Sequence, residues 1–375
     1  MKDAPTFAGY TKDQIVNVKD AGFDAKGDGT KDESAALNAI LLYFPYGVYV
    51  VRSTLFIPPG SRIVGEAWPV ISGAGPAFSD ADNPAPVVKI GNPNDVGVAQ
   101  ISDMRFTVAE PLAGAKIMEW NMAGASNRDV GIWNSIVNIG GMRDSTVQRS
   151  CGDQNPCQAA HTGVHLTASS SVYAQNLWVW TADHSEDDRD APLQIISTGR
   201  GILVESTKAT WLVGTGSEHH WLYGYNFNSA NNVYAGLLQV ESPYMQGRGA
   251  VQVAPAPWTA RNGDPDFSWC NGGDSYRRTS VGVNVQNSQS IYLYSSSTWA
   301  FFDEEWNGQY GPENQCEPDC QANANRVAGS TSALSWYGVN TKAAQTMILD
   351  GKSNPKMLNN PGSWGGNLVA YRQFA

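Results

Sequence analysis

The chain of 375 residues carries a formal net charge of −10 and contains 42% hydrophobic and 16% charged residues, as expected for a folded globular protein rather than a disordered one. Such an acidic chain is not attracted to nucleic acid or to anionic membranes, and we expect neither as a partner. No apolar run reaches the roughly 18 residues that a membrane-spanning helix needs, whereas a neutral polysaccharide remains compatible with the charge.

Residues 1–14 are polar and irregular, and we interpret them as an arm or linker before a single domain over 15–375. A strand over 15–19 precedes a glycine-rich turn, which lacks the sequence context of a phosphate-binding loop. A short helix is predicted over 31–42, because alanine and leucine follow polar residues that could cap its first turn.

Beyond this helix, short apolar runs alternate with polar turns. Runs that are apolar throughout favour parallel sheets over an antiparallel sandwich, and a sandwich or propeller would need more Asn-Gly hairpin turns than occur here. The expected strands are 87–90, 101–106, 117–120, 132–139, 164–167, 172–180, 281–285, 291–294, 334–339 and 347–349.

Two β-rich runs in the middle of the chain, 210–215 and 233–238, lie 23 residues apart. Glu218 follows the first run and Glu241 follows the second, so the two carboxylates have the same spacing as the runs. A repeat of about 20–25 residues built from short strands is typical of a solenoid whose coils stack. We therefore predict an all-β parallel solenoid with one short N-terminal helix.

An earlier run ends just before Asp183 and His184, a pair that resembles Glu218 and His219 in the later run. Neighbouring strands of a parallel stack lie about 4.8 Å apart. The sequence therefore predicts that Asp183, Glu218 and Glu241 form an acidic ladder on one face of the solenoid.

The cysteines form two close pairs, Cys151 with Cys157 and Cys316 with Cys320, and leave Cys270 unpaired. The pairs lie in loop-like sequence, which suits local disulfides in a secreted protein, with free buried thiols as the alternative. Their spacings, C-x5-C and C-x3-C, do not indicate a zinc site, and we expect no metal or other cofactor. The opening residues contain no signal-peptide core, so the targeting segment of a secreted protein would lie outside this sequence.

Several motifs resemble known families. The opening V-N-V-K-D-A-G-F-D-A-K-G-D-G-T-K-D-E-S-A-A-L is similar to the start of pectate-lyase-like right-handed β-helices. Later motifs resemble the second half of the tandem β-helix β-1,3-glucanases, the laminarinases of glycoside hydrolase family fifty-five, and the likeness covers nearly the whole chain. These later motifs are F-I-P-P-G-S-R-I-V-G-E-A-W, W-V-W-T-A-D-H, G-R-G-I-L, S-E-H-H and E-S-P-Y.

The resemblance implies a right-handed parallel β-helix that hydrolyses β-1,3-glucan. It implies an exo-acting, inverting enzyme that releases glucose from laminarin-like chains, with Glu241 as the general acid. The family places its cleft between two β-helices, so a preceding N-terminal β-helix half is an implied partner beside the glucan. Two departures are a single β-helix in this chain and a connection near 40–43 that is several residues short.

The residues themselves support acid catalysis at the two glutamates. Like-charge proximity raises the pKa of one carboxyl and keeps it protonated near neutral pH, as glycoside hydrolysis requires. Adjacent strands favour the short carboxylate separation of retaining enzymes, whereas the resemblance implies inversion, which we follow. The alternative is that Glu218 and Glu241 are surface residues on a solvated turn.

Further candidates surround these glutamates. We expect polar side chains to contact sugar hydroxyls and aromatic rings to stack on glucose, although structural histidines and core packing are the alternatives. A Ser/His/Asp triad has no nucleophile-elbow motif to support it. The candidate substrate-binding residues are Asp183, His184, His219, Tyr244, Trp180 and Trp299.

Two other functions remain open from the sequence. The first is a non-catalytic glucan-binding half-enzyme that needs a second β-helix. The second is a polysaccharide lyase, which would want basic residues and often calcium around an anionic substrate, against the acidic ladder expected here.

Overall fold

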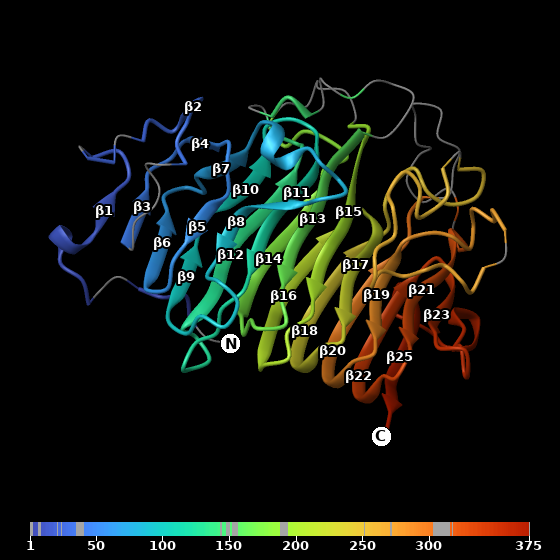
Figure 1. Ribbon diagram of the computed structural model, residues 1–375. Helices are drawn as coiled ribbons and strands as arrows, with labels where there is room; N and C mark the ends of the chain where they lie inside the picture. The colour runs from blue at the N-terminus through green and yellow to red at the C-terminus, as the bar shows by residue number, and fades with distance from the viewer. Residues whose placement is uncertain are drawn as a thin grey trace.

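The computed structural model is an elongated stack of strands, which runs from β1 at one end to β23 and β25 at the other (Figure 1). Among the described residues, helix comprises three 3-10 turns at Lys12–Gln14, Pro76–Phe78 and Met357–Asn359, and the single residue Val147. None of these turns is long and apolar enough to cross a membrane. The structure describes residues 3–6, 9–20, 22–23, 25–34, 41–142, 145–147, 151, 157–187, 194–250, 252–270, 272–302, 316 and 318–374.

The larger sheet, sheet A, has 16 strands. Its main path is β1 (Val16–Asn17), β3 (Leu41–Phe44), β6 (Ser61–Gly65), β9 (Ala99–Ser102), β12 (Val130–Ile139), β14 (Tyr173–Thr181), β16 (Thr210–Glu218), β18 (Asn231–Glu241), β20 (Gln289–Trp299), β22 (Ser332–Lys342), β25 (Gly365–Gln373) and β24 (Pro361–Gly362). Beside this path lie β2 (Asp28–Asp32), β4 (Val48–Val51), β7 (Val70–Gly73) and β10 (Arg105–Val108).

The smaller sheet, sheet B, has 9 strands. In order they are β23 (Ala344–Leu349), β21 (Gln321–Ala328), β19 (Val281–Gln286), β17 (His220–Asn228), β15 (Ile196–Val204), β13 (Cys157–Leu166), β11 (Leu112–Trp120), β8 (Ala85–Ile90) and β5 (Leu55–Ile57).

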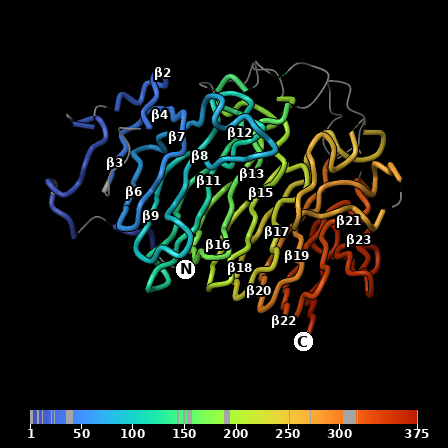
Figure 2. The backbone as a smooth tube through the Cα atoms, viewed as in Figure 1, coloured from blue at the N-terminus to red at the C-terminus, as the bar shows by residue number. Residues whose placement is uncertain are grey.

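From β11 to β22 the chain alternates strictly between the two sheets, so each coil contributes one strand to each. Successive strands of one sheet pair in parallel, and Figure 2 shows the backbone advancing along the stack coil by coil. Only the pairs β22–β25 and β24–β25 are antiparallel among the described ladders between named strands. The predicted parallel β-helix is thus confirmed.

The long strands of sheet A bend at one position that recurs from coil to coil. Gly214, Leu237, Ser295 and Gly338 all have φ between 58° and 64°, and the register on either side aligns them. This left-handed conformation costs least for glycine, so two glycines at this position fit the requirement. The bend separates the first half of each strand from the second half, at whose end the candidate site lies.

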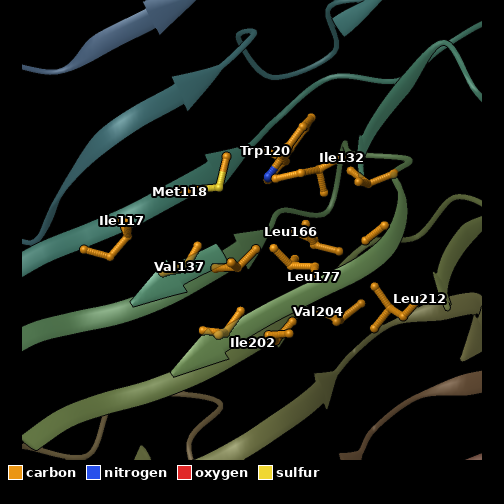
Figure 3. Close-up of a cluster of buried hydrophobic side chains, with 14 of the residues drawn as sticks. Ile117, Met118, Trp120, Ile132, Val137, Leu166, Leu177, Ile202, Val204 and Leu212 are labelled. Carbon is orange, nitrogen blue, oxygen red and sulfur yellow. The ribbon is translucent and has the colours of Figure 1, made fainter. Parts of the chain in front are cut away.

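The core fills the space between the sheets. In β18 the side chains of Val233, Ala235, Leu238 and Val240 are buried, and they alternate with more exposed residues on either side of the bend at 236–237. Figure 3 shows how side chains from successive coils meet in one apolar cluster. Burying a side chain of this size contributes about 1.5–3 kcal/mol. The labelled examples are Ile117, Met118, Trp120, Ile132, Val137, Leu166, Leu177, Ile202, Val204 and Leu212.

The bounds of the helix predicted over 31–42 are wrong, because strand β2 extends to Asp32 and strand β3 begins at Leu41. Residues 35–40, the interior of the predicted helix, lie outside the described residues. The Asp32 carboxylate accepts hydrogen bonds from the backbone N–H groups of Ser34 and Arg52, both at 3.1 Å. At the two described ends of the segment, pairing with neighbouring coils outweighs the local helix propensity.

Both expected disulfides form, Cys151 with Cys157 and Cys316 with Cys320. Their Cα atoms lie 5.4 Å and 4.8 Å apart, within the usual range for a disulfide. Cys270 is buried and belongs to neither disulfide, which accounts for the odd cysteine count.

The connection from β18 to β19, residues 242–280, forms a second apolar cluster with β17 of sheet B. A buried ion pair fastens it there: Arg200 of β15 binds Asp264, and their side chains are 2% and 4% exposed. Arg200 also donates to the carbonyl of Thr259 and to Nε2 of His161, each at 3.0 Å. Burial and the charge of Arg200 lower the pKa of His161 to about 2, so the neutral ring accepts this hydrogen bond.

Candidate active site

The candidate site lies where four neighbouring strands of sheet A end. The final residues of β16, β18, β20 and β22 are Glu218, Glu241, Trp299 and Lys342. Glu241 pairs with Trp299, and Trp299 pairs with Lys342. His219 donates its backbone N–H to the Glu241 carbonyl at 3.1 Å, which continues the parallel register through Glu218 and Glu241. The two glutamates therefore occupy adjacent coils on one face, as the 23-residue spacing predicted.

The coil at this point is short. Strand β16 ends at Glu218, His219 alone makes the turn with φ of 62°, and β17 begins at His220. The following coil is much longer, because residues 242–280 are inserted after Glu241. The repeat of about 20–25 residues predicted from the sequence therefore holds for this coil but not for its neighbour.

Glu218 is the carboxyl that holds a proton most firmly. Burial, and after it the negative charge of Glu241, raises the pKa of Glu218 to about 7. Gly216, two residues before Glu218, has no side chain, and this allows Gln239 and Trp178 to approach. A Cβ atom at Gly216 would lie 3.1 Å from both Oε1 of Gln239 and Cδ1 of Trp178. The site thus contains a carboxyl that is protonated over much of the neutral pH range.

Glu241 is more open, with 25% of its side chain exposed. Gln239 donates from Nε2 to Oε1 of Glu241 at 3.0 Å, and Nε2 of His219 lies 3.3 Å from Oε2. The other ring nitrogen of His219 donates to the Thr181 carbonyl at 3.1 Å, which fixes the ring. Burial lowers the pKa of His219, but Glu241 and Asp183 outweigh it and raise that pKa above its ordinary value.

Asp183 is not a step of the acidic ladder, so that part of the prediction is wrong. The register places Trp180, three residues earlier, beside Glu218. Asp183 lies just beyond the end of β14, where its Oδ1 is 2.6 Å from Nδ1 of His184. His184 is 59% exposed, and its ring meets Trp180 edge to face at a centroid distance of 5.2 Å. Both residues border the site without entering the ladder.

The three predicted stacking residues have different surroundings. Trp180 is buried and stacks on Trp178, with ring centroids 4.8 Å apart. Tyr244 is also buried: its hydroxyl donates to the Ala182 carbonyl, and its ring meets His219 at 5.5 Å. Because its ring is buried against His219, Tyr244 supports that histidine and offers no ring face to a ligand. Trp299 is partly exposed and lies beside Glu241.

Other residues of the site had not been predicted. A first group, Trp178, Gly216 and Gln239, occupies outward positions two residues before Trp180, Glu218 and Glu241. Lys342 is the buried final residue of β22, and Trp364 contacts it from the last hairpin. Alternation within W-V-W, G-S-E and Q-V-E could have identified the first group, whereas the hairpin contact has no local sequence signal. The residues are Trp178, Gly216, Gln239, Lys342 and Trp364.

The part of the chain that the structure describes contains no group of three or more His, Cys, Asp and Glu side chains that could hold a metal ion. A proton-holding carboxyl beside an open carboxylate suits acid catalysis of glycoside cleavage.

Stacked parallel coils with a carboxyl pair at their strand ends define the class as a parallel β-helix. A family model described as "Rhamnogalacturonase A/epimerase, pectate lyase-like" matches residues 15–237. The chain belongs to this pectate-lyase-like family.

Alignments with named relatives cover nearly the whole chain. A glucan endo-1,3-beta-glucosidase, BGN13.1, of Trichoderma harzianum is 38% identical over 98% of this chain and 50% of its own length. A glucan 1,3-beta-glucosidase of Cochliobolus carbonum is 32% identical over 99% of this chain and 47% of its own. The predicted resemblance to β-1,3-glucanases is thereby confirmed, and the chain spans about half the length of these relatives.

The solved structures include one with the same fold. A variant of sacteLam55A from Streptomyces sp. SirexAA-E, in complex with glucose, aligns with a TM-score of 0.51 and 15% identity. The alignment covers 90% of this chain and 52% of that one. At this identity the likeness bears on the fold alone.

The pKa of Glu218 leads to a prediction about stability. Because folding raises this pKa from 4.5 to about 7, the folded state binds the proton more tightly than the unfolded state. The free energy of unfolding should therefore fall as pH rises from 4.5 to 7. Glu218→Gln removes this dependence and should stabilise the protein by about 3 kcal/mol at pH 8, but not at pH 4. Chemical unfolding of both proteins at pH 4 and pH 8 measures the change in the free energy of unfolding. An equal change at the two pH values would contradict the raised pKa of Glu218.

Proposed function

We propose that this chain forms the acid-bearing part of a β-1,3-glucan hydrolase. The observation that carries the proposal is the carboxyl pair Glu218–Glu241 on adjacent coils, one member of which has its pKa raised to about 7. Aromatic residues flank the pair on both sides, Trp178 and Trp180 before it and Trp299 after it. The names of the relatives support β-1,3-glucan as the substrate.

In this proposal Glu241 donates a proton to the glycosidic oxygen. Its more exposed position favours it for this role, and Gln239 and His219 hold its two oxygens in place. Glu218, the neighbouring carboxyl, has its pKa raised to about 7 and is the member of the pair that holds a proton below that pH. A water molecule then attacks the anomeric carbon from the opposite side, which inverts its configuration. Inversion and exo-acting release of glucose rest on the family resemblance.

We further propose that a second β-helix completes the cleft. The chain covers 50% and 47% of the two glucanase relatives, so a comparable length of polypeptide lies outside the matched region in each. The site of a single β-helix contacts the glucan from one side only, so no group from the opposite side positions the attacking water. The two disulfides fit secretion, which we propose as the location of the protein.

The test compares hydrolysis with binding. We expect the chain alone to be retained on insoluble β-1,3-glucan but to release reducing sugar from laminarin at least about a hundredfold more slowly than a two-helix relative, because misplacing one reacting group costs about that much. Retention without any hydrolysis, even when a preceding β-helix is supplied, would favour the non-catalytic binding role. An unsaturated product, detected by its ultraviolet absorbance, would identify a lyase and refute hydrolysis.

A further inference from the structure

The hairpin formed by β24 and β25 places an exposed tryptophan next to the candidate site. Gly362 pairs with Gly365, so Ser363 and Trp364 form the tip of a two-residue turn. Gly366 pairs with Thr341 on β22, which brings this tip against the end of that strand. A Cβ on Gly365 would lie 2.6 Å from the Thr341 carbonyl oxygen, so only glycine permits this approach.

Trp364 is held in a defined orientation. Its ring centroid lies 5.2 Å from that of Trp299 at an interplanar angle of 69°, and 5.9 Å from that of Phe301 at 64°. The ammonium of Lys342, a buried residue, lies 3.9 Å from the Trp364 centroid and 4.1 Å from the Phe301 centroid. Each of these contacts restricts the rotation of the indole, so the ring is already oriented before any ligand binds.

Despite these contacts, Trp364 remains 57% exposed. The Lys342 ammonium lies over the indole, and more than half of the residue stays exposed even with this contact in place. Turn tips are usually built from small or polar residues, whereas an indole here leaves a broad apolar surface in water. A rigid, half-exposed aromatic ring is suited to stacking on an apolar ring face of matching size.

The distance between Trp364 and the proposed acid, Glu241, indicates which sugar unit of a bound glucan would stack on Trp364. Lys342 lies two strands beyond Glu241 along the stack, with Trp299 between them, or about 10 Å at the usual strand spacing. A sugar stacked on Trp364 therefore belongs to a neighbouring unit of the chain and not to the unit whose bond is cleaved.

We propose that Trp364, oriented by Lys342 and Trp299, is a glucose-stacking residue that binds the glucan chain away from the cleavage point. The proposal rests on the proposed function and deepens it, because it makes affinity depend on chain length. Short ligands that end near Glu241 do not reach this ring, whereas longer β-1,3-linked chains do.

The experiment measures the dissociation constants of a β-1,3-linked glucose hexamer and dimer by calorimetry. We expect Trp364→Ala to weaken hexamer binding about three- to tenfold, as for the loss of one aromatic contact, and to leave dimer binding unchanged. Trp364→Phe should restore most of the loss. Trp68→Ala is the matched control, because Trp68 is an exposed tryptophan on the turn between β6 and β7, several coils away, and should change neither constant.

The other outcomes separate the two proposals. Unchanged hexamer binding by Trp364→Ala, with only a lower unfolding temperature, would show that Trp364 merely packs the end of the solenoid. Equal weakening of hexamer and dimer would also overturn the proposal. Failure of the wild-type chain to bind either oligosaccharide, together with full laminarin hydrolysis by Glu241→Gln, would instead refute the proposed function.

Discussion

Glu241→Gln should lower kcat on laminarin by about two to four orders of magnitude, the usual cost of losing a general acid. The amide is nearly isosteric with the carboxyl and removes one charge from a repulsive pair, so the fold should be retained. The rate is measured on the form that hydrolyses laminarin, either the chain alone or with a preceding β-helix. An aryl glucoside with a good leaving group needs less protonation and should lose much less.

A matched control is Glu110→Gln. Glu110 accepts a hydrogen bond from the backbone N–H of Gly75 at 2.8 Å, which an amide oxygen can also accept. It lies near the N-terminal end of the stack, before β11, and the substitution should leave kcat unchanged. If Glu241→Gln hydrolyses laminarin within a few-fold of the wild type, Glu241 is not the acid.

Asp264→Ala should lower the free energy of unfolding by about 3–5 kcal/mol, because it leaves the buried Arg200 without its carboxylate. The pair ties the 242–280 insertion to sheet B, and this insertion begins next to Glu241, the proposed acid. Denaturant unfolding monitored by tryptophan fluorescence measures the loss.

The exposed pair Arg277–Asp274 provides the comparison. Its side chains are 62% and 42% exposed, and Arg277→Ala should cost under about 1 kcal/mol. Replacing Arg200 and Asp264 together by Met and Leu should recover much of the loss, since no unpaired charge is then buried. Equal losses of unfolding free energy from Asp264→Ala and Arg277→Ala would show that burial of the Arg200–Asp264 pair adds nothing to its effect on stability.

The position of Glu218 beside Glu241 could be predicted from the sequence because the coil between them has no insertion. Strand β16 is followed by His219 alone and then by β17, so the number of residues between Glu218 and Glu241 equals one full coil. The same spacing rule failed for Asp183, because the length of the previous turn is not encoded in any repeat. The register of β14 placed Trp180 there instead.

Contacts between segments that are far apart in the sequence explain the other differences between the predicted and the observed structure. Tyr244 looks like a surface aromatic in E-S-P-Y, but the insertion that follows it supplies a second apolar cluster in which its ring is buried. The segment 31–42 has helix-forming residues, yet its described ends pair with β4 and β6. The contact between Trp364 and Lys342 joins segments that no local pattern connects.

Strand β25 reverses direction against β22, and this reversal has a consequence for self-association. A parallel stack that simply stopped at β22 would leave a row of unpaired backbone groups, on which another molecule could continue the ladder. The antiparallel β25 covers that edge from Leu334 to Thr341 and cannot propagate the coil geometry. Shortened versions of this chain that lack the last hairpin would therefore be prone to end-to-end aggregation, whatever the effect on glucan binding.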